Sequence, residues 1–401
     1  MHLNYASFDF FNTFYGSFML KLSTAAIVKN EGEYLLEWFA YHWLVGVRYF
    51  LIADNESTDN TATILRCLHD LGIVSFVYFP TSQNLKPQLP AYQKLVAIAP
   101  KDIDLIAFID ADEFLVPLNG DERVNPFLDG VFSDESISAL AMQWACFGSA
   151  GHLFKDDGMV IERFTRQSAA KFTANKNYKS VARPSAIKDF HNPHYINLRG
   201  GRYVNTMLED LTEVGQSNGV SKQVVWEGIR VNHYVVKSLE EFVVGKSRKG
   251  SAASQGRVKH KKYFQNHDRN EEEWCFPPIF VEKVRDLTIR LAELVEVHSQ
   301  QTKRATPVKL TKSQRKWRKI IIDSGTFEPF WYLVSYPDVF RAGYDPLDHY
   351  IKYGAAERRS PAEGFDPSYY LKQNPDVAKS EMNPFAHYLK FGRIEGRQPH
   401  A

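Results

Sequence analysis

The chain has 401 residues, of which 44% are hydrophobic and 24% charged, so it has enough apolar mass for two or three compact domains and is neither disordered nor fibrous. Its 49 basic and 47 acidic side chains give a formal net charge of +2, which provides no general attraction for nucleic acid. The aromatic content of 14% is high, and such rings either fill a core or stack on sugars.

Cysteine usage and hydropathy bear on the compartment. Cys67, Cys146 and Cys275 are far apart and odd in number, which argues against a disulfide framework or a zinc ribbon and favours a reducing cytoplasm. The patchy apolar stretch 8–20 has no Lys or Arg before it and no small-residue cleavage site after it, so we expect no signal peptide. No run reaches the roughly 18 apolar residues of a spanning helix, so any membrane contact is expected to be peripheral.

From residue 23 to about residue 115, short apolar runs alternate with amphipathic stretches, which is typical of a βαβ series. The pattern predicts an α/β fold with a mostly parallel sheet and flanking helices. Four strands are expected in this region: Thr24–Val28, Tyr49–Ala53, Val74–Phe79 and Leu105–Ile109.

Two helices are expected between the first three of these strands. Asn30 can cap the first helix with Glu33 as its reciprocal partner, and Gly46 is placed to end it. A polar cluster leads into the second helix, with Ser57 or Asp59 as the cap.

The middle of the chain, from about 133 to 244, is mixed and loop-rich, with strands expected at Ile137–Trp144 and Ile229–Tyr234. A helix is expected at Ile279–Val297. Eight basic residues then fall within the seventeen positions 303–319, which we interpret as a linker with a solvated face. The alternative is a surface for an anionic membrane or partner.

The C-terminal part is a sequence repeat. Residues 327–361 align without a gap on residues 365–399, at a spacing of 38 and with fifteen identities in 35 positions. In each copy Asp345-Pro346 or Asn383-Pro384 supplies a helix cap followed by proline. Gly354 and Gly392 stand where those helices should stop. We therefore expect short helical units in which the repeated aromatic residues serve mainly as scaffold.

Two carboxylates follow the fourth expected strand directly. Asp110 and Asp112 stand at the carboxyl end of Leu105–Ile109, which is the edge where open α/β sheets bind ligands. If the strand continued, both side chains would share a face and reach one ion. Carboxylates suit Mn²⁺ or Mg²⁺, which keep open positions for phosphate oxygens. An Asp-x-Asp pair is also common by chance, and the alternative is a capped turn.

Polar residues also follow the first two strands. The groups are Lys29, Asn30 and Glu31 after the first strand, and Asp54, Asn55, Ser57 and Asp59 after the second. The chain has neither a G-x-G-x-x-G nor a G-x-x-x-x-G-K motif. These groups therefore predict a nucleotide held by side chains and a metal instead of by a glycine-rich loop. The alternative is that they only cap loops.

Several segments together closely resemble the family 2-like glycosyltransferases that border on family 92, within the GT-A superfamily. The segments are 26–42, 54–59, 108–114, 144–152, 162–164 and 232–238. The resemblance covers about residues 20–250 and implies a Rossmann-like GT-A fold. The 38-residue unit also resembles repeats appended to bacterial glycosyltransferases of surface polysaccharide clusters.

The resemblance implies roles for individual residues. Asp54 and its neighbours would contact the nucleotide base and ribose, Asp110 and Asp112 would hold the ribose and the metal-bound diphosphate, and His233 would complete the ion's shell. The nucleotide-binding set is Lys29, Asn30, Glu31, Asp54, Asn55, Ser57, Asp59, Gln88 and Asp110, and the metal set is Asp110, Asp112 and His233. Lys29, Lys237 or Lys246 would add positive charge. A satisfied histidine at a strand end is the alternative for His233.

The catalytic base is left between several residues. Glu162 and His152 are the first candidates, because an inverting transferase needs a carboxylate or imidazole beside the acceptor hydroxyl. For Glu162 the alternative is a structural ion pair with Arg163. The other candidates are Glu113, Asp156, Asp157 and His194. Rings that would stack on an acceptor sugar, or line the core, are Trp144, Phe147, Tyr178 and Trp226.

The predicted organisation is an N-terminal segment (1–22), a GT-A catalytic domain (23–250), a helical and basic linker region (251–325) and two helical repeats (326–401). The predicted function is transfer of a sugar from a nucleotide diphosphate donor, with Mn²⁺ or Mg²⁺, to a glycan or lipid-linked acceptor in bacterial surface polysaccharide synthesis. We expect inversion of configuration and a cytoplasmic location. For the basic stretches 246–262 and 303–319, peripheral contact with the membrane is one interpretation and a solvated basic loop is the other. The alternatives are a nucleotidyltransferase and a non-catalytic protein that binds glycans through the repeats.

Overall fold

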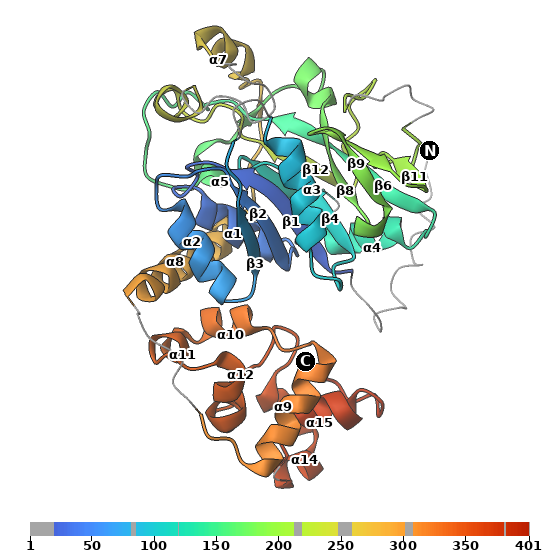
Figure 1. The fold of residues 1–401 in the computed structure, drawn as a ribbon, viewed down its shortest axis with the longest axis vertical. Helices are drawn as coiled ribbons and strands as arrows, with labels where there is room; N and C mark the ends of the chain where they lie inside the picture. The colour runs from blue at the N-terminus through green and yellow to red at the C-terminus, as the bar shows by residue number, and fades with distance from the viewer. Residues whose placement is uncertain are drawn as a thin grey trace, which may run out of the picture. The chain divides into compact units, whose positions relative to one another are not determined.

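The structure is a computed structural model that describes residues 20–81, 86–118, 120–211, 219–247, 259–300, 308–380 and 382–400. The chain divides into two compact units (Figure 1). The first consists of Met1–Ile27, Tyr41–Ala53 and Phe79–Cys275, and the second of Val28–Ala40, Asp54–Tyr78 and Phe276–Ala401. The expected N-terminal segment lies almost entirely outside the described residues, as do positions 248–258 and 303–307 of the basic stretches.

The first unit is built on a mixed β-sheet. Its strands lie in the order β2 (Tyr49–Asp54), β1 (Leu22–Val28), β4 (Leu105–Phe108), β8 (Tyr178–Ala182), β6 (Ile137–Cys146), β12 (Ile229–His233) and β5 (Glu113–Pro117), and β11 (Arg202–Val204) pairs with β6. Strand β1 is parallel to β4, and β12 is parallel to β6. Strand β8 is antiparallel to both β4 and β6, and β5 is antiparallel to β12. The predicted α/β class is confirmed, and the antiparallel strands β5 and β8 are additions to the expected parallel set.

The central strands are buried on both faces, which is why their sequences read as continuous apolar runs. All four residues of β4 are buried. Helix α3 (Gln88–Ile98) packs beside β9 (Ile187–Asn192), and α4 (Asn125–Phe132) packs on β6. Strands β9 and β10 (Tyr195–Leu198) form a separate antiparallel pair. Because β4 is packed on both faces, its last residue, Phe108, has a fixed position. The candidate site begins directly after it.

The start of the first helix differs from the prediction. Helix α1 (Leu35–Leu44) begins five residues after Asn30, so the prediction that Asn30 caps it is wrong. Asn30 has a left-handed backbone with φ of 51°, and its Oδ1 accepts a hydrogen bond of 2.6 Å from the backbone N–H of Thr58. The asparagine side chain therefore joins two loops instead of capping a helix, a competition that short polar side chains often win.

The second unit contains helix α2 (Thr61–Asp70), strand β3 (Val74–Tyr78) and the C-terminal helices. Helix α8 (Pro278–Gln300) confirms the helix expected at 279–297 and packs on α2, α10 (Pro329–Ser335) and α11 (Pro337–Arg341). Its buried residues recur at helical spacing: Phe280, Val284, Leu287, Leu291 and Leu294.

The repeat region is all-helical, as predicted. The first copy forms α10, α11, α12 (Pro346–His349) and the π-helical turn η4 (Tyr350–Gly354), and the second forms α13 (Pro367–Gln373), α14 (Pro375–Lys379), α15 (Pro384–His387) and η5 (Tyr388–Gly392). Helix α9 (Lys312–Ser324) packs on both copies, through η4, α15 and η5.

Repeated residues of this region make repeated contacts. The Tyr332 hydroxyl lies 3.1 Å from Nδ1 of His349, and the Tyr370 hydroxyl lies 3.0 Å from Nδ1 of His387. The expected caps form as well, because Asp345 Oδ1 accepts from the N–H of Asp348 at 2.8 Å. The repeated Tyr and His positions are therefore scaffold, as expected.

Candidate active site

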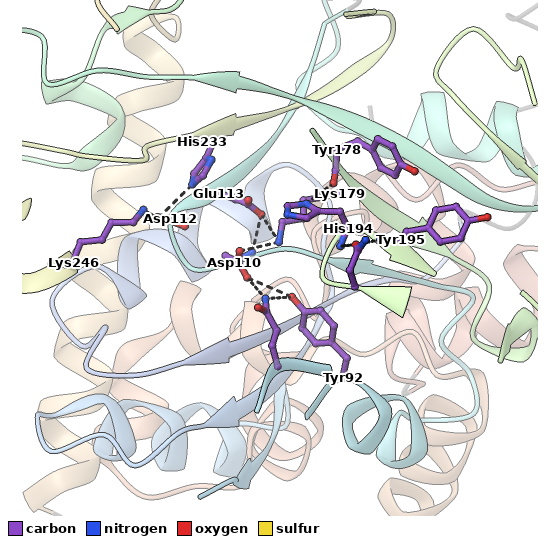
Figure 2. A network of polar contacts seen from close by, with 12 residues as sticks. Tyr92, Asp110, Asp112, Glu113, Tyr178, Lys179, His194, Tyr195, His233 and Lys246 are labelled. Carbon is purple, nitrogen blue, oxygen red and sulfur yellow. Dashed lines mark hydrogen bonds and ion pairs between the residues drawn. The ribbon is translucent and has the colours of Figure 1, made fainter. Parts of the chain in front are cut away.

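The two predicted carboxylates lie on a tight turn between β4 and β5. Strand β4 ends at Phe108, and the N–H of Glu113 donates to the carbonyl of Asp110 at 3.0 Å to close the turn. The strand therefore does not continue through Asp112, and the two aspartates point to different partners (Figure 2). The sequence predicts that Asp110 and Asp112 share a face if the strand continues through them, and it does not continue.

Asp110 is held by three side chains from other elements. Its Oδ1 accepts from Gln88 Nε2 at 2.9 Å and from the Tyr92 hydroxyl at 3.4 Å, both on α3, and its Oδ2 accepts from Lys179 Nζ of β8 at 2.8 Å. One third of the Asp110 side chain remains exposed. The carboxylate is thus fixed in orientation while it keeps an open side for a ligand.

Lys179 serves two carboxylates at once. Its side chain has no exposed surface and lies 3.5 Å from Glu113 Oε2, which itself accepts from the N–H of Asp110 at 2.9 Å. Burial alone would raise the pKa of Asp110, but the Lys179 ammonium holds that pKa below its ordinary value. Burial, together with the charges of Asp110 and Asp112, raises the pKa of Glu113 to about 8. One lysine thus keeps Asp110 ionised beside a carboxyl group that binds its proton more tightly.

Asp112 faces a different pair of side chains. Its Oδ2 lies 3.6 Å from His233 Nε2, at the end of β12, and forms an ion pair with Lys246 (Figure 2). Burial raises the pKa of Asp112, but Lys246 and His233 outweigh it and lower the pKa well below its ordinary value. Burial lowers the pKa of His233 to about 4, so its imidazole is neutral at neutral pH. Lys246 is one of the lysines expected from the sequence to add positive charge at the diphosphate, and in the structure this lysine pairs with Asp112.

Asp112 and His233 have the chemistry of a site for a divalent cation. A carboxylate oxygen and a neutral imidazole nitrogen face each other, and Nδ1 of His233 is buried with no hydrogen-bond partner among the described residues. These donors suit Mn²⁺. Among the described residues no three His, Cys, Asp or Glu side chains converge on one point, so further ligands would come from phosphate oxygens or water.

Trp144 links this site to a second histidine. Its ring lies 4.3 Å from the ring of His233 and 5.1 Å from that of His194, measured between centroids. His194 Nδ1 is 2.9 Å from the carbonyl of Tyr178, so Nδ1 carries the proton. Burial and the charge of Lys179 lower the pKa of His194 to about 4. Trp144 therefore lines the site.

The other predicted acceptor rings do not share this position. Phe147 and Tyr178 have no exposed surface and belong to the core. Trp226 donates from Nε1 to the Trp144 carbonyl at 3.0 Å and covers the guanidinium of buried Arg230 at 4.8 Å. For Phe147 and Tyr178 the packing interpretation is correct, whereas Trp226 is only partly buried.

In the second unit, the predicted nucleotide-binding loops are joined by side-chain to backbone hydrogen bonds. Ser57 Oγ accepts from the N–H of Asn30 at 2.9 Å, and Asp59 accepts from Gly32 and Thr61 at 3.0 Å each. Asp54 Oδ1 accepts from the N–H of Ser57 at 3.1 Å. Each of these hydrogen bonds satisfies a backbone donor of a loop or of the first turn of α2. The residue that precedes α2 is Asn60, so the prediction that Ser57 or Asp59 caps this helix is wrong.

The remaining members of that set are placed as follows. Lys29 Nζ lies 3.9 Å from the carboxylate of Glu56, while Asn55 is buried and donates its N–H to the carbonyl of Val28 at 2.8 Å. The N–H of Glu31 donates to Thr61 Oγ1 at 3.1 Å. These residues hold the loops at the ends of β1 and β2 in one conformation.

The two leading candidates for the base line one cavity of the first unit, with a volume of about 490 Å³. Its walls are Ala150, His152, Asp157, Gly158, Glu162, Arg163, Thr165, Arg166 and Glu273. Glu162 Oε2 accepts from the N–H of Met159 at 3.1 Å. Arg163, the other member of the structural pair considered for Glu162, forms a bidentate pair with Glu241, at 2.8 and 2.9 Å.

Sequence reasoning missed Lys179 and Tyr92, which fix Asp110. The signal for Lys179 is a lysine inside a strand-forming run, Tyr178–Ala182. Such a position is buried when the strand is central, and a buried lysine requires a carboxylate partner. For Tyr92 the signal is weaker, because an aromatic residue on an amphipathic helix is usually part of the core.

Comparison with known proteins identifies one family. A model of glycosyltransferase family 92 matches residues 23–304. A glycosyltransferase family 92 protein of Oryza sativa subsp. japonica is 26% identical over 192 residues, which covers 46% of this chain and 31% of the relative. One of Ricinus communis is 24% identical over 192 residues, covering 46% and 33%, respectively. The chain thus spans about a third of the length of the curated relatives it matches.

Among solved structures, S. aureus TarS 1–349 in complex with UDP-GlcNAc is 12% identical, with 84% of this chain and 92% of that chain covered and a TM-score of 0.31. Glucosyl-3-phosphoglycerate synthase from Mycobacterium tuberculosis in complex with Mn²⁺, UDP and glucosyl-3-phosphoglycerate is 17% identical, with 42% and 58% covered and a TM-score of 0.25.

Proposed function

Because the chain belongs to glycosyltransferase family 92, we propose that it transfers a sugar from a nucleotide diphosphate donor to a glycan or lipid-linked acceptor. The observation that carries the proposal is the family match across 23–304, which includes the Asp110–Asp112 turn and its partners. We take the donor to be UDP-linked, residues 23–250 to be the catalytic domain, and the pathway to be bacterial surface polysaccharide synthesis at the cytoplasmic side of a membrane.

Asp112 and His233 are the residues that would hold a divalent cation, Mn²⁺ or Mg²⁺. Such an ion neutralises the charge that develops on the leaving nucleoside diphosphate. Support comes from the lowered pKa values of both groups, which leave an ionised carboxylate and a neutral imidazole. Lys246, now paired with Asp112, brings a further positive charge to the diphosphate.

Asp110 has the task of orienting the donor. Gln88 and Lys179 hold its carboxylate at 2.9 and 2.8 Å, so it can accept hydrogen bonds from ribose hydroxyls with little loss of side-chain entropy. We propose that Lys29, Asn30, Glu31, Asp54, Asn55, Ser57 and Asp59 bind the nucleotide through the faces that their loop contacts leave open.

The acceptor hydroxyl needs a base that removes its proton as the new bond forms. We propose that the acceptor binds in the cavity lined by His152 and Glu162, because a carboxylate and an imidazole both line this cavity. Inversion of configuration follows from a single displacement with such a base.

The test is donor turnover with product identification. The wild-type chain, with Mn²⁺, should hydrolyse a UDP-sugar slowly and release UDP, while Asp112→Asn should reduce this at least about 100-fold with the protein still folded. Asp134→Asn, at a surface carboxylate remote in sequence, is the matched control and should behave as wild type. Undiminished turnover of Asp112→Asn, or in excess EDTA, contradicts the metal-assisted mechanism. Release of pyrophosphate in place of UDP indicates a nucleotidyltransferase instead.

A further inference from the structure

Large apolar side chains are exposed on two neighbouring segments of the first unit. On the loop after Gly151, Leu153 is 61% and Phe154 is 73% exposed. On the π-helical turn η3 (Phe242–Lys246), Val243 is 48% and Val244 is 57% exposed. Single exposed apolar residues are ordinary on a protein surface, but a cluster of them marks an interaction site. These four residues are called the apolar patch below.

Backbone hydrogen bonds join the two segments. The N–H of Leu239 donates to the carbonyl of His152 at 3.2 Å, and the N–H of Glu240 donates to the carbonyl of Leu153 at 3.0 Å. The carboxylate of Glu240 also accepts from the N–H of Lys155 at 2.8 Å. The two segments that carry the apolar patch are therefore held side by side.

The exposed valines belong to a well-anchored helix. Phe242, the residue before them, is 2% exposed and packs on two rings of α7 (Lys261–His267). Its ring is parallel to that of Tyr263 at 6.1 Å and meets that of Phe264 edge-on at 5.2 Å. Phe242 is therefore buried against α7, whereas the next two residues, Val243 and Val244, are exposed. The helix thus has one apolar side that is packed and another that is open to solvent.

Helix α7, near the top of Figure 1, adds positive charge beside this helix. Lys261 and Lys262 are exposed at its start, and Lys259 places its ammonium 5.2 Å from the Tyr263 ring centroid. The valines of η3 thus have lysines beside them, a combination that suits an anionic bilayer, since the apolar groups enter the boundary between headgroups and acyl chains while the lysines meet the phosphates.

The patch starts beside the cavity of about 490 Å³. His152 lines that cavity, and its carbonyl forms the first of the hydrogen bonds that join the two segments. A bilayer held at Leu153 and Phe154 would thus lie next to the cavity wall. Only this last step, the use of the cavity for the acceptor, rests on the proposed function.

We propose that the apolar patch of Leu153, Phe154, Val243 and Val244 inserts into the surface of an anionic phospholipid bilayer, with the lysines of α7 on the headgroups, so that a lipid-linked acceptor reaches the cavity from the membrane. Among the described residues no helix is long and apolar enough to cross a bilayer, so this contact is one with a single membrane face.

The experiment is flotation of the full chain with vesicles of phosphatidylcholine alone and of phosphatidylcholine with phosphatidylglycerol. The wild type should float with the anionic vesicles and much less with the neutral ones. The double variant Phe154→Ser/Val244→Ser should partition about tenfold more weakly, because two apolar side chains no longer enter the bilayer. The matched control is Ile394→Ser, at an apolar residue that is 87% exposed in the repeat region, and it should bind as wild type.

Two further variants separate insertion from charge. The tryptophan introduced by Phe154→Trp should shift its fluorescence to shorter wavelength on anionic vesicles, and Lys261→Gln/Lys262→Gln should lower binding to them and weaken its dependence on salt. No flotation of the wild type, equal flotation of Phe154→Ser/Val244→Ser, or an unshifted emission of the Phe154→Trp variant overturns the proposal. UDP-sugar hydrolysis without vesicles tests the proposed function separately, and neither result decides the other.

Discussion

Lys179 and Asp110 form an ion pair of 2.8 Å between Nζ and Oδ2, and the lysine side chain has no exposed surface. The pair joins the antiparallel strand β8 to the turn after β4, so a positive charge from the middle of the sheet sets the position of the first carboxylate. Asp110 and Glu113 raise the pKa of Lys179 against the opposing effect of its burial, so the lysine stays charged. Lys179 thus organises the candidate site, although Asp110 is the only one of the three predicted metal ligands that it contacts.

Replacing Lys179 should cost stability as well as activity. Lys179→Met leaves the ionised carboxylate of Asp110 and the carboxyl group of Glu113 without the ammonium group that lies beside both. Loss of one partner from a buried ion pair costs about 3 kcal/mol or more. Urea unfolding followed by circular dichroism measures the loss. Lys372→Met, at an exposed lysine of the second repeat, should change the free energy of unfolding by less than about 0.5 kcal/mol. Equal stability of the two variants would contradict a central role for the pair.

Glu113 should make the protein less stable as the pH rises from 6.5 to 8. Its pKa is raised from 4.5 to about 8 in the folded state, so over this range the folded chain holds a proton that the unfolded chain has released. The stabilisation is complete below the unfolded pKa and is lost as the pH passes through the folded one. The lowered pKa values of His194 and His233 act in the opposite direction up to about pH 7, because the imidazoles of the unfolded chain are still half protonated near pH 6.5, and this contribution is common to wild type and a Glu113 variant.

The measurement is the free energy of unfolding in urea at pH 6.5, 7.2 and 8. Glu113→Gln, which keeps the size of the side chain and cannot titrate, should show a flatter profile than wild type. Parallel profiles for the two proteins would mean that Glu113 is ionised throughout.

The glycines at the ends of η4 and η5 should not tolerate a methyl group. A Cβ at Gly354 would lie 2.1 Å from the hydroxyl of Tyr332, which is buried and positioned by His349. Gly354→Ala should therefore lower stability by about 1–3 kcal/mol, the usual cost of overpacking. Thermal unfolding checks this, and Gly364→Ala is the matched control because a Cβ there meets nothing within 4 Å. A melting temperature of Gly354→Ala equal to that of Gly364→Ala would show that the tyrosine moves freely.

Glu162 should act on the acceptor and not on the donor. If it is the base, Glu162→Gln lowers the kcat of transfer by about 10²–10⁴-fold, while the Kd for UDP, measured by calorimetry, stays as in wild type. Asp156→Asn alters an exposed carboxylate that lies on the loop before the short helix α5 (Val160–Arg163) and does not line the cavity, and it should retain activity. His152→Gln is the parallel test of the second candidate. Full transfer activity of both cavity variants would move the search to His194.

Local patterns in the sequence were sufficient for much of the fold. The strands β1, β2, β3 and β4 are runs rich in apolar residues that show as apolar segments whatever lies around them, and the repeat is visible as identity at a fixed spacing. The same locality explains the error at Asn30, because one side chain can either cap a helix or join two loops and the sequence does not state which.

The chain alone also placed Asp110 and Asp112 at the carboxyl end of a strand, since that depends only on the apolar run before them. Only the tertiary structure shows that the two side chains have different partners. Asp110 contacts Gln88 and Lys179. Asp112 contacts His233 and Lys246. Those contacts depend on the register of β8 and β12 in the mixed sheet, and register is set by packing between segments that are distant in the sequence. Local hydrophobic patterning determines which residues are buried, whereas the pairing of distant strands determines which charges meet.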